Sequence, residues 1–249
     1  MKNILLTGAT GFLGSYILRE LINRNYNVVI LKRSISDDWR IKDLMNKIIS
    51  YDIDKIDIEN PFKQQNIDII IHTATNYGRN VSSIYGVVET NLMFPLKLLE
   101  IAVSYNTKVF INTDTLLKKD INHYSLSKKQ LLEWFKYFSN NIKIINLKLE
   151  HIYGPKDDDS KFVSKIINQL LANVSNINLT KGEQKRDFIY IDDVVNVYTL
   201  VLENIYKFDS YNELDVGTGN QIELKYFIKK IYDTINNKIA IDTKLNFGA

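Results

Sequence analysis

A tyrosine and a lysine lie four residues apart in the segment YSLSK, at Tyr124 and Lys128. On a helix this spacing places the phenol and the ammonium group on one face, one turn apart. A free tyrosine has a pKa near ~10, so it needs a nearby positive charge to exchange protons well at neutral pH. Lowering this pKa toward neutral pH requires about 3–4 kcal/mol, which is roughly what one cation a few ångströms away supplies. The pair predicts a proton-transfer site in which Lys128 lowers the pKa of Tyr124.

Three polar residues, Thr113, Asp114 and Thr115, end an apolar run shortly before this pair. The hydroxyl of Thr113 is placed to hydrogen-bond a substrate oxygen while that oxygen exchanges a proton with Tyr124. Asp114 is a candidate for a contact with a substrate hydroxyl, the alternative being a cap of the loop. We expect the carboxyl end of this strand to face the substrate.

Three glycines mark the turn after the first apolar run, in TGATGFLG at 7–14. Gly8 permits a tight turn, Gly11 lets the backbone approach a pyrophosphate, and Gly14 lets a helix pack closely on a strand. A helix that begins here presents N–H donors and the positive end of its dipole. The order strand, turn, helix predicts a dinucleotide site, and the alternative is a purely structural turn.

The second strand ends in Lys32, Arg33 and Ser34, with no acid before Asp37. A site for NAD usually places Asp or Glu here, where it accepts a hydrogen bond from the ribose 2′-OH. Two cations and a hydroxyl suit a 2′-phosphate instead, because arginine binds phosphate bidentately. We expect NADP(H) to be preferred over NAD(H); the alternative is an ordinary solvated basic loop.

Composition excludes several classes of protein. The chain has 249 residues, 32 basic and 29 acidic side chains, and no cysteine. It therefore has no disulfide scaffold, cysteine zinc site or thiol catalysis. Lysines are scattered rather than gathered, which disfavours a nucleic-acid partner, and no apolar run approaches the ~20 residues of a membrane span. With only three histidines we expect no metal, and we expect a cytoplasmic protein.

The elements that must position these residues alternate regularly. Strand-like apolar runs occupy 2–6, 28–31, 47–51, 67–71, 108–112 and 142–149, and helical patterns occupy 12–24, 87–105 and 124–138. Strands alternating with helices predict an α/β fold with a doubly wound parallel sheet of Rossmann type.

The alternation loosens after Gly154–Pro155. We expect a dinucleotide-binding domain over 1–155 and a small, interleaved C-terminal substrate lobe over 156–249. Helices are expected there at 162–171, 192–203 and 225–234, with Asp192 or Asp193 as the N-cap of the second.

The chain resembles the extended short-chain dehydrogenase/reductase family, within it the NAD(P)-dependent sugar epimerases and dehydratases. The resemblance runs from Met1 to about Leu224 and rests on motifs in the family's order: TGATGFLG (7–14), YSLSK (124–128), IYGP (152–155), KRDFIYIDD (185–193) and LDVGTG (214–219). It implies an enzyme that binds a nucleotide-sugar and forms a homodimer. Members usually extend further at the C-terminus, so we expect a shorter substrate lobe here.

The resemblance also implies roles for individual residues. Tyr124 would be the acid/base, Lys128 would hold the nicotinamide ribose, and Arg186 would bind the substrate's pyrophosphate. The implied catalytic tetrad is Asn91, Thr113, Tyr124 and Lys128. The implied cofactor contacts are Gly8, Thr10, Gly11, Phe12, Leu13, Gly14, Lys32, Arg33, Ser34, Asp52, Ile53, Thr73, Ala74, Tyr124 and Lys128, with Asp57–Ile58 competing for the adenine role of Asp52–Ile53. The implied substrate contacts are Asp114, Thr115, His151, Arg186 and Tyr77.

Two positions depart from the family's pattern R-x-x-N-x-Y-G-P. The arginine is replaced by Lys148 and the asparagine by His151. His151 is either a sugar contact or a structural histidine.

The residues after the fifth strand narrow the reaction. Family 4,6-dehydratases carry Thr-Asp-Glu, whose glutamate removes a sugar proton, whereas this chain has Thr115 in that place. A threonine hydroxyl is far too weak a base, so dehydration is disfavoured. Expected NADPH use favours net reduction of a nucleotide-linked 4-keto-deoxyhexose, and the segments 72–79 and 111–115 resemble reductases of CDP-linked sugars. The alternatives are a nucleotide-sugar 4-epimerase and a non-catalytic redox sensor that binds NADP.

Overall fold

The structure is a computed structural model that describes residues 2–79 and 83–248. The chain forms two compact units, each described by itself here. The sheet unit comprises Met1–Leu149 and Val195–Val216, and the small unit comprises Glu150–Val194 and Gly217–Ala249. The chain returns to the sheet unit because the last strand of that unit, Tyr211–Val216, pairs with the strand Lys143–Leu149. The domain boundary near residue 155 stays a prediction.

The sheet unit is built on a parallel sheet of seven strands. Its order is β11-β6-β5-β4-β1-β2-β3, so the chain winds in both directions from β1. The strands are β1 (Asn3–Thr7), β2 (Asn27–Lys32), β3 (Ile49–Asp52), β4 (Ile69–His72), β5 (Val109–Thr115), β6 (Lys143–Leu149) and β11 (Tyr211–Val216). The predicted doubly wound α/β fold is confirmed, and the reversal of strand order at β1 and β4 is where such sheets bind ligands.

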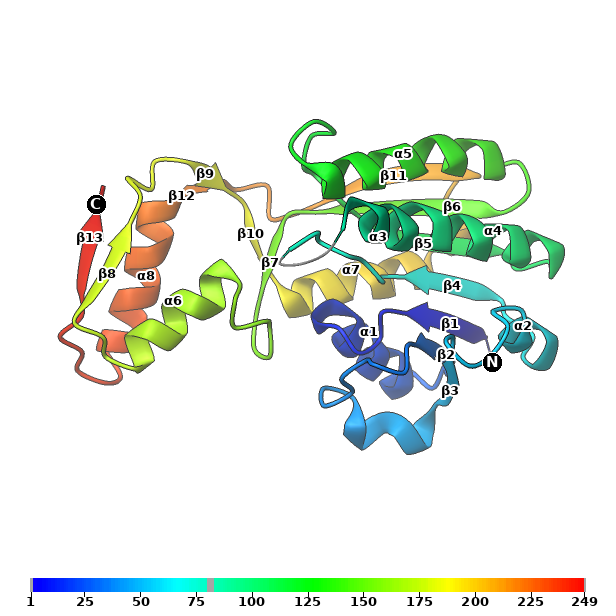
Figure 1. Ribbon diagram of the computed structural model, residues 1–249, viewed down its shortest axis with the longest axis horizontal. Coiled ribbons are helices and arrows are strands. Elements are labelled where there is room, and N and C mark those ends of the chain that lie inside the picture. The colour runs from blue at the N-terminus through cyan, green and yellow to red at the C-terminus, as the bar shows by residue number, and fades with distance from the viewer. Residues whose placement is uncertain (1, 80–82, 249) are drawn as a thin grey trace. The chain divides into compact units, whose positions relative to one another are not determined.

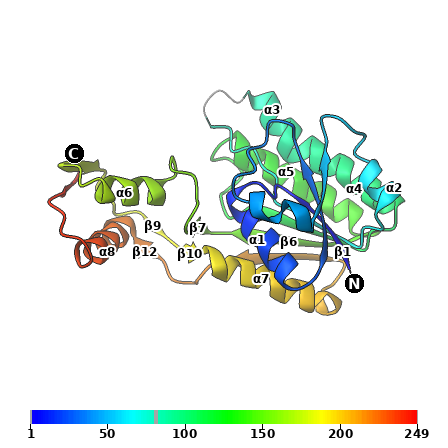
Figure 2. The same ribbon diagram turned by 90° about the horizontal axis from the view of Figure 1, so that it is seen from below.

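Helices cover both faces of this sheet (Figures 1 and 2). One face carries α3 (Ile84–Val88), α4 (Phe94–Ser104) and α5 (His123–Phe138), and the other carries α1 (Phe12–Asn23) and α7 (Ile191–Glu203). The short α2 (Asn60–Gln64) and the 3₁₀ segments η1 (Lys42–Lys47) and η3 (Ile205–Lys207) lie in connections. Strand residues such as Leu5, Ile70 and Phe110 pack under Leu98 and Phe135 of α4 and α5 in one apolar core.

The single helix expected over 87–105 is interrupted. Between α3 and α4 the chain forms a π-helical turn, η2 (Glu89–Met93), with Asn91 at its centre. Pro95 lies in the first turn of α4 and has no N–H to donate to the carbonyl of Asn91, four residues earlier. π-helical turns inside helices are frequent at functional sites.

The predicted N-cap of α7 is wrong. The helix begins at Ile191, so Asp192 and Asp193 lie within its first turn. Carboxylates are favourable there because they face the positive end of the helix dipole, which explains why the sequence resembled a cap.

The small unit contains two helices, α6 (Phe162–Leu171) and α8 (Leu224–Asn236), around a core that includes Ile166 and Ile228. Its six short strands pair in three ladders. They are β7 (His151–Tyr153) with β10 (Phe188–Tyr190), β8 (Asn176–Leu179) with β13 (Lys244–Phe247), and β9 (Lys185–Arg186) with β12 (Ile222–Glu223). Among the described residues, no helix is long and apolar enough to cross a bilayer.

Candidate active site

The turn between β1 and α1 requires glycine at two positions. Gly8 has φ +74°, and a Cβ there would lie 2.6 Å from both the Ala74 nitrogen and the Thr73 Oγ1. A Cβ on Gly14 would lie 2.1 Å from the Gly8 carbonyl oxygen. Side chains at these positions would therefore separate α1 from the ends of β1 and β4.

This turn fits the pyrophosphate of a dinucleotide. Gly11 is the N-cap of α1 and has no side chain to cover the N–H groups of the first turn, where Phe12 and Leu13 lie. The opposite side of the turn is fixed as well, because the Thr73 hydroxyl donates to the Thr7 carbonyl at 2.8 Å. A helix N-terminus with a close-packed glycine turn is a binding site for phosphate groups.

The end of β2 differs in one respect from the sequence expectation. The Ser34 hydroxyl donates to Asp52 at 2.6 Å, and the Ser34 N–H donates to Asp54 at 2.8 Å. The fold thus brings two carboxylates from β3 and its following loop to a segment that lacks an acid of its own. Ser34 is therefore engaged by Asp52, whereas Lys32 lies partly exposed at the end of β2 and Arg33 is exposed after it.

The two Asp–Ile pairs proposed for adenine also have partners within the protein. The Ile53 N–H donates to the Lys32 carbonyl at 2.9 Å, so it extends the β2–β3 ladder. The Ser34 hydroxyl holds the pKa of Asp52 below its usual value. In the competing pair, Asp57 accepts the Glu59 N–H at 3.1 Å and Ile58 is buried.

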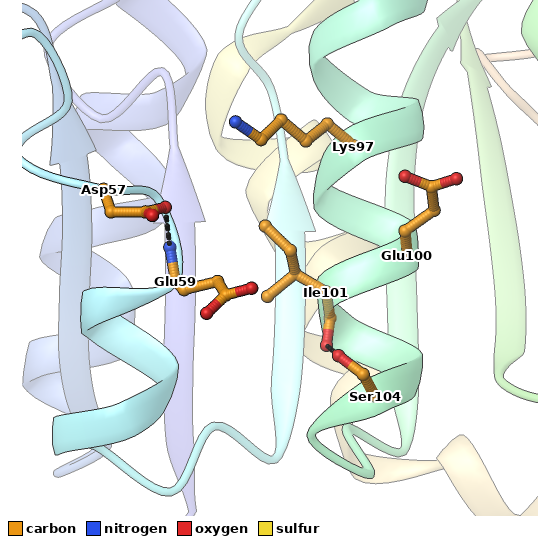
Figure 3. Close-up of a pocket in the computed structure, with 6 residues that line it drawn as sticks. All are labelled: Asp57, Glu59, Lys97, Glu100, Ile101 and Ser104. Atoms are coloured by element: carbon orange, nitrogen blue, oxygen red, sulfur yellow. Dashed lines mark hydrogen bonds between the residues drawn. The ribbon is translucent and has the colours of Figure 1, made fainter.

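A surface pocket of about 330 Å³ lies beside this second pair, between the start of α2 and α4 (Figure 3). Its lining is mainly charged and comprises Asp57, Glu59, Lys97, Glu100, Ile101 and Ser104. None of the residues that we assigned to catalysis lines this pocket.

Tyr124 lies in the first turn of α5, where a capping box fixes the helix start. Asn122 accepts the Ser125 N–H, and the Ser125 hydroxyl accepts the Asn122 N–H. The phenol is largely buried, and the hydroxyls of Thr75 and Thr115 act to lower its pKa. The half-exposed ring of Tyr77 packs against it at 5.1 Å between centroids.

The expected effect of Lys128 on Tyr124 is not what the structure shows. Burial raises the pKa of Tyr124, and Tyr77 and Asp114 raise it further. Burial also lowers the pKa of Lys128 to about 8, opposed by Asp114 and assisted by Lys129. Desolvation disfavours the charged form of each partner and is the largest cause of both shifts.

The hydroxyl of Thr113 bonds a tyrosine other than Tyr124. This hydroxyl lies 2.6 Å from the phenolic oxygen of Tyr198, a buried residue of α7. Thr113 and Thr115 share one face of β5, and of the two it is Thr115, at the end of the strand, that lowers the pKa of Tyr124. The sequence contained no signal for Tyr198, because the helix that carries it returns to the sheet unit from a distant part of the chain.

Asp114 faces the other side of β5, into a buried polar network. Its carboxylate accepts from Lys129 at 2.9 Å, from Asn146 at 3.1 Å and from the Thr115 N–H at 2.7 Å. The Asp114 side chain has no exposed surface. This placement argues against the expected contact with a substrate hydroxyl, because the carboxylate is fully occupied by the protein.

Asn91 is buried and joins the loop after β4 to α5. Its Oδ1 accepts from the Asn76 N–H at 2.8 Å and from the Thr75 hydroxyl at 3.2 Å. Its Nδ2 donates to the Asn76 carbonyl at 2.8 Å and to the Ser127 hydroxyl at 3.1 Å. The structure thus links Asn91 to the start of α5, which carries Tyr124 and Lys128, and the threonines that lower the pKa of Tyr124 are Thr75 and Thr115. Thr75 carried no signal in the sequence except its position shortly after β4.

The remaining predicted residues belong to the small unit. His151 is partly exposed, with its Nδ1 3.4 Å from Glu150 and its ring 5.8 Å from that of Phe188. Arg186 is exposed on β9 and donates to the Lys185 carbonyl at 2.7 Å. The rings of Phe188 and Phe227 stack at 3.8 Å. An exposed arginine and stacked rings are suited to a phosphate group and a flat base.

The close packing at the glycine turn yields one prediction. Gly14→Ala should destabilise the protein by about 1–3 kcal/mol, because backbone atoms must move to admit the methyl group. Gly86→Ala in α3 is the matched control, since its Cβ would meet the Ser83 hydroxyl at an ordinary 3.4 Å. Urea unfolding should show the control unchanged or stabilised by up to ~1 kcal/mol. Equal effects of the two substitutions would contradict the packing argument.

Burial of Lys128 yields a second prediction, for the protein without dinucleotide. Its pKa falls from 10.5 to about 8, so the folded protein disfavours the ammonium form, at a cost of roughly 3 kcal/mol. Lys128→Met removes this cost and should stabilise the fold by that amount below pH 8. Between pH 8 and 10.5 the unfolded chain binds a proton that the folded one lacks, so the advantage of the variant should shrink.

Urea titrations of the wild type and Lys128→Met across this pH range measure the difference directly. The exposed Lys136→Met on the same helix controls for the other lysines and tyrosines that titrate there. An advantage of Lys128→Met that stays constant with pH would contradict the prediction.

Comparison with known proteins places the chain in a family. The model of the NAD dependent epimerase/dehydratase family matches residues 4–217. CDP-abequose synthase of Salmonella muenchen is 37% identical over an alignment of 257 residues, and this alignment covers 100% of this chain and 84% of that protein. CDP-abequose synthase of Salmonella typhimurium is 36% identical over 93% of this chain and 80% of that protein.

Solved structures agree on the fold. UDP-glucuronic acid 4-epimerase from Bacillus cereus, in complex with UDP-glucuronic acid and NAD, has a TM-score of 0.82 at 24% identity, covering 99% of this chain and 86% of that chain. The resemblance stated from the motifs is therefore confirmed. This chain belongs to the NAD dependent epimerase/dehydratase family and is an NAD(P)-dependent enzyme.

Proposed function

We propose that this enzyme reduces a nucleotide-linked 4-keto-deoxyhexose with NADPH, and that the nucleotide is CDP. The observation that carries the proposal is that a threonine, Thr115, ends β5 where a dehydratase would carry its glutamate base, and that its hydroxyl lowers the pKa of Tyr124. The carboxylate that acts on this phenol, Asp114, is buried against Lys129. Among the described residues, the one carboxylate that acts on this phenol is thus occupied by Lys129, which favours hydride exchange with one proton transfer as the chemistry.

In this proposal Tyr124 gives its proton to the sugar oxygen as the keto group becomes an alcohol. When bound, a reduced nicotinamide dinucleotide supplies the hydride that adds to the keto carbon. The glycine turn of Gly8, Gly11 and Gly14, with Thr10, Phe12, Leu13, Thr73 and Ala74, would hold the dinucleotide.

Lys128 would stabilise the phenolate that remains after proton transfer. Its pKa of about 8 keeps it mostly protonated at neutral pH, despite burial. A bound substrate excludes water, which strengthens the attraction between the Lys128 ammonium and the phenolate. Asn91 fixes the backbone that carries Tyr124, through Ser127, whose hydroxyl donates to the Tyr124 carbonyl at 2.8 Å.

Relatives support the choice of substrate. The two relatives with identities of 36–37% are both CDP-abequose synthases, and each alignment covers at least 93% of this chain. We assign the sugar-nucleotide diphosphate to Arg186, with His151 and Tyr77 as sugar contacts. The homodimer and the cytoplasmic location stay predictions.

Preference for NADPH rests on Lys32 and Arg33. Both cations stand at the end of β2 and are at least partly exposed to solvent. Ser34 is left out of this assignment because Asp52 engages its hydroxyl. We propose that Arg33 binds the 2′-phosphate bidentately.

The reaction is tested with a panel of CDP-, dTDP- and GDP-linked 4-keto-deoxysugars, following NADPH oxidation. Tyr124→Phe should lower the rate by about 10²- to 10⁴-fold, because the general acid is lost. Tyr137→Phe on the exposed side of the same helix is the control and should keep the wild-type rate. Absence of NADPH consumption with every sugar would reject the proposal. Conversion of a sugar without net oxidation would identify an epimerase instead.

Cofactor choice is tested by titrating NADPH and NADH into the protein and its variants. Arg33→Ala should weaken NADPH binding by about 10-fold or more, the usual effect of removing a charged hydrogen bond, and should leave NADH binding unchanged. Lys47→Ala, an exposed cation at the end of η1, is the control. Equal affinities of the wild type for both dinucleotides would refute the preference.

A further inference from the structure

Asp187 of the small unit is a carboxylate with only 4% of its surface exposed. It stands between two short strands, because Arg186 ends β9 immediately before it and Phe188 begins β10 immediately after it. Burying a carboxylate is costly unless hydrogen bonds satisfy its oxygens. The partners of Asp187 therefore indicate what this carboxylate does for its neighbours.

Both oxygens of the carboxylate bind the loop 217–220, which precedes β12. The Thr218 hydroxyl donates to Oδ1 of Asp187 at 2.6 Å, and the Gly219 N–H donates to Oδ2 at 2.8 Å. The same threonine oxygen accepts the Asn220 N–H at 3.1 Å, so the loop closes around the carboxylate. Hydrogen bonds to an ionised acceptor are about twice as strong as neutral ones. Asp187 therefore holds this loop in one conformation.

Glycine at position 217 allows the close approach of loop and carboxylate. A Cβ on Gly217 would lie 2.7 Å from Oδ2 of Asp187 and 2.9 Å from Cγ of Glu150. Both distances are too short for a side chain, so the two acidic side chains pack directly on the backbone of this residue. The start of the loop is thus fixed by packing, and its middle is fixed by hydrogen bonds.

The held loop also determines where Arg186 lies. β12 follows the loop, and its Ile222 is the partner of Arg186 in the antiparallel β9–β12 ladder. On the other side, the Asp187 carbonyl accepts the His151 N–H at 3.1 Å, where β7 begins. Neighbouring side chains of an extended chain point to opposite sides, in agreement with a buried Asp187 beside an exposed Arg186. Asp187 therefore joins the segments that carry Arg186 and His151.

We propose that Asp187 is a positioning residue for Arg186, acting through the loop 217–220 and β12. The inference rests on the proposed role of Arg186 in binding the diphosphate of the sugar nucleotide. Asp187 itself makes no contact with the substrate in this proposal. An arginine whose strand is already held loses less freedom when the diphosphate binds, so the carboxylate contributes to affinity rather than to the chemical step.

The experiment titrates CDP, dTDP and GDP into the full chain by calorimetry, and the nucleotide that binds most tightly is used with the variants. Arg186→Ala should weaken its binding by about 10-fold or more, because a charged hydrogen bond to phosphate is lost. Thr218→Val keeps the shape of the side chain but removes the hydroxyl, and should weaken binding by about 5-fold or more. Thr218→Ser should restore the affinity, and the exposed Thr234→Val on α8 is the matched control that should leave it unchanged.

A double-mutant cycle separates positioning from a general structural role. In the Arg186→Ala protein, Thr218→Val should change the nucleotide affinity by less than about 2-fold, because the side chain through which it acts is gone. Asp187→Ala should give the same pattern, and the affinity for NADPH should stay unchanged in every variant. With any sugar that the enzyme reduces, Thr218→Val should raise KM and leave kcat nearly unchanged. The Thr218 variants keep the test valid should Asp187→Ala fail to fold.

Each outcome decides for or against the positioning role. It is overturned if Thr218→Val costs the same affinity with and without Arg186, if Thr218→Ser fails like Thr218→Val, or if Thr218→Val binds like the wild type. Unchanged binding by Arg186→Ala, or no binding of any of the three nucleotides by the wild type, would reject both this role and the assignment of Arg186. Coupling of Thr218 to Arg186 in a protein that reduces none of the sugars would retain the role of Asp187 and reject the reductase.

Discussion

The carboxamide of Asn91 is the contact on which the rest of the site depends. It bonds the main chain of Asn76 on both sides, the hydroxyl of Thr75 and the hydroxyl of Ser127. Through these bonds a single buried side chain fixes the loop after β4 against α5. An amide can bridge donors and acceptors at once, which a hydrophobic residue in the same place could not do. Loss of this side chain would remove a partner from polar groups of both segments.

The π-helical turn around Asn91 follows from the same requirement. A regular helix from Ile84 to Ser104 would carry Asn91 at a different angle, and Pro95 already prevents a regular hydrogen-bond pattern there. The interruption is compatible with stability because α4 remains packed on the core through Leu98 and Leu99. Local irregularity is thus confined to the residues that hold the site.

Burial explains the electrostatics of the site more fully than pairing does. Tyr124 and Lys128 both lie in a region of low polarity, where each resists its charged form. The protonation of such a pair is sensitive to its surroundings, because a further charge or hydrogen bond shifts the two pKa values strongly where water is excluded. The threonine hydroxyls act on this balance at short range, while Asp114, held by Lys129, opposes the phenolate.

The sequence by itself determined the helices and strands, the doubly wound α/β fold class and the dinucleotide turn, because periodicity and glycine spacing are local properties of the chain. Gly8 and Gly14 could be assigned in advance because only glycine admits the backbone contacts that they make. Asn91, Tyr124 and Lys128 were also predicted, although from the resemblance and from helical spacing rather than from contacts. Tertiary structure alone decided whether Thr113 or Thr115 acts on the phenol of Tyr124. The two threonines share one face of β5, and only their neighbours in the fold distinguish them. Tertiary structure likewise brought Asp52 and Asp54 to Ser34, turned Asp114 inward and placed Tyr198 on Thr113. These contacts join segments far apart in the chain, and no local pattern of residues records which of them meet.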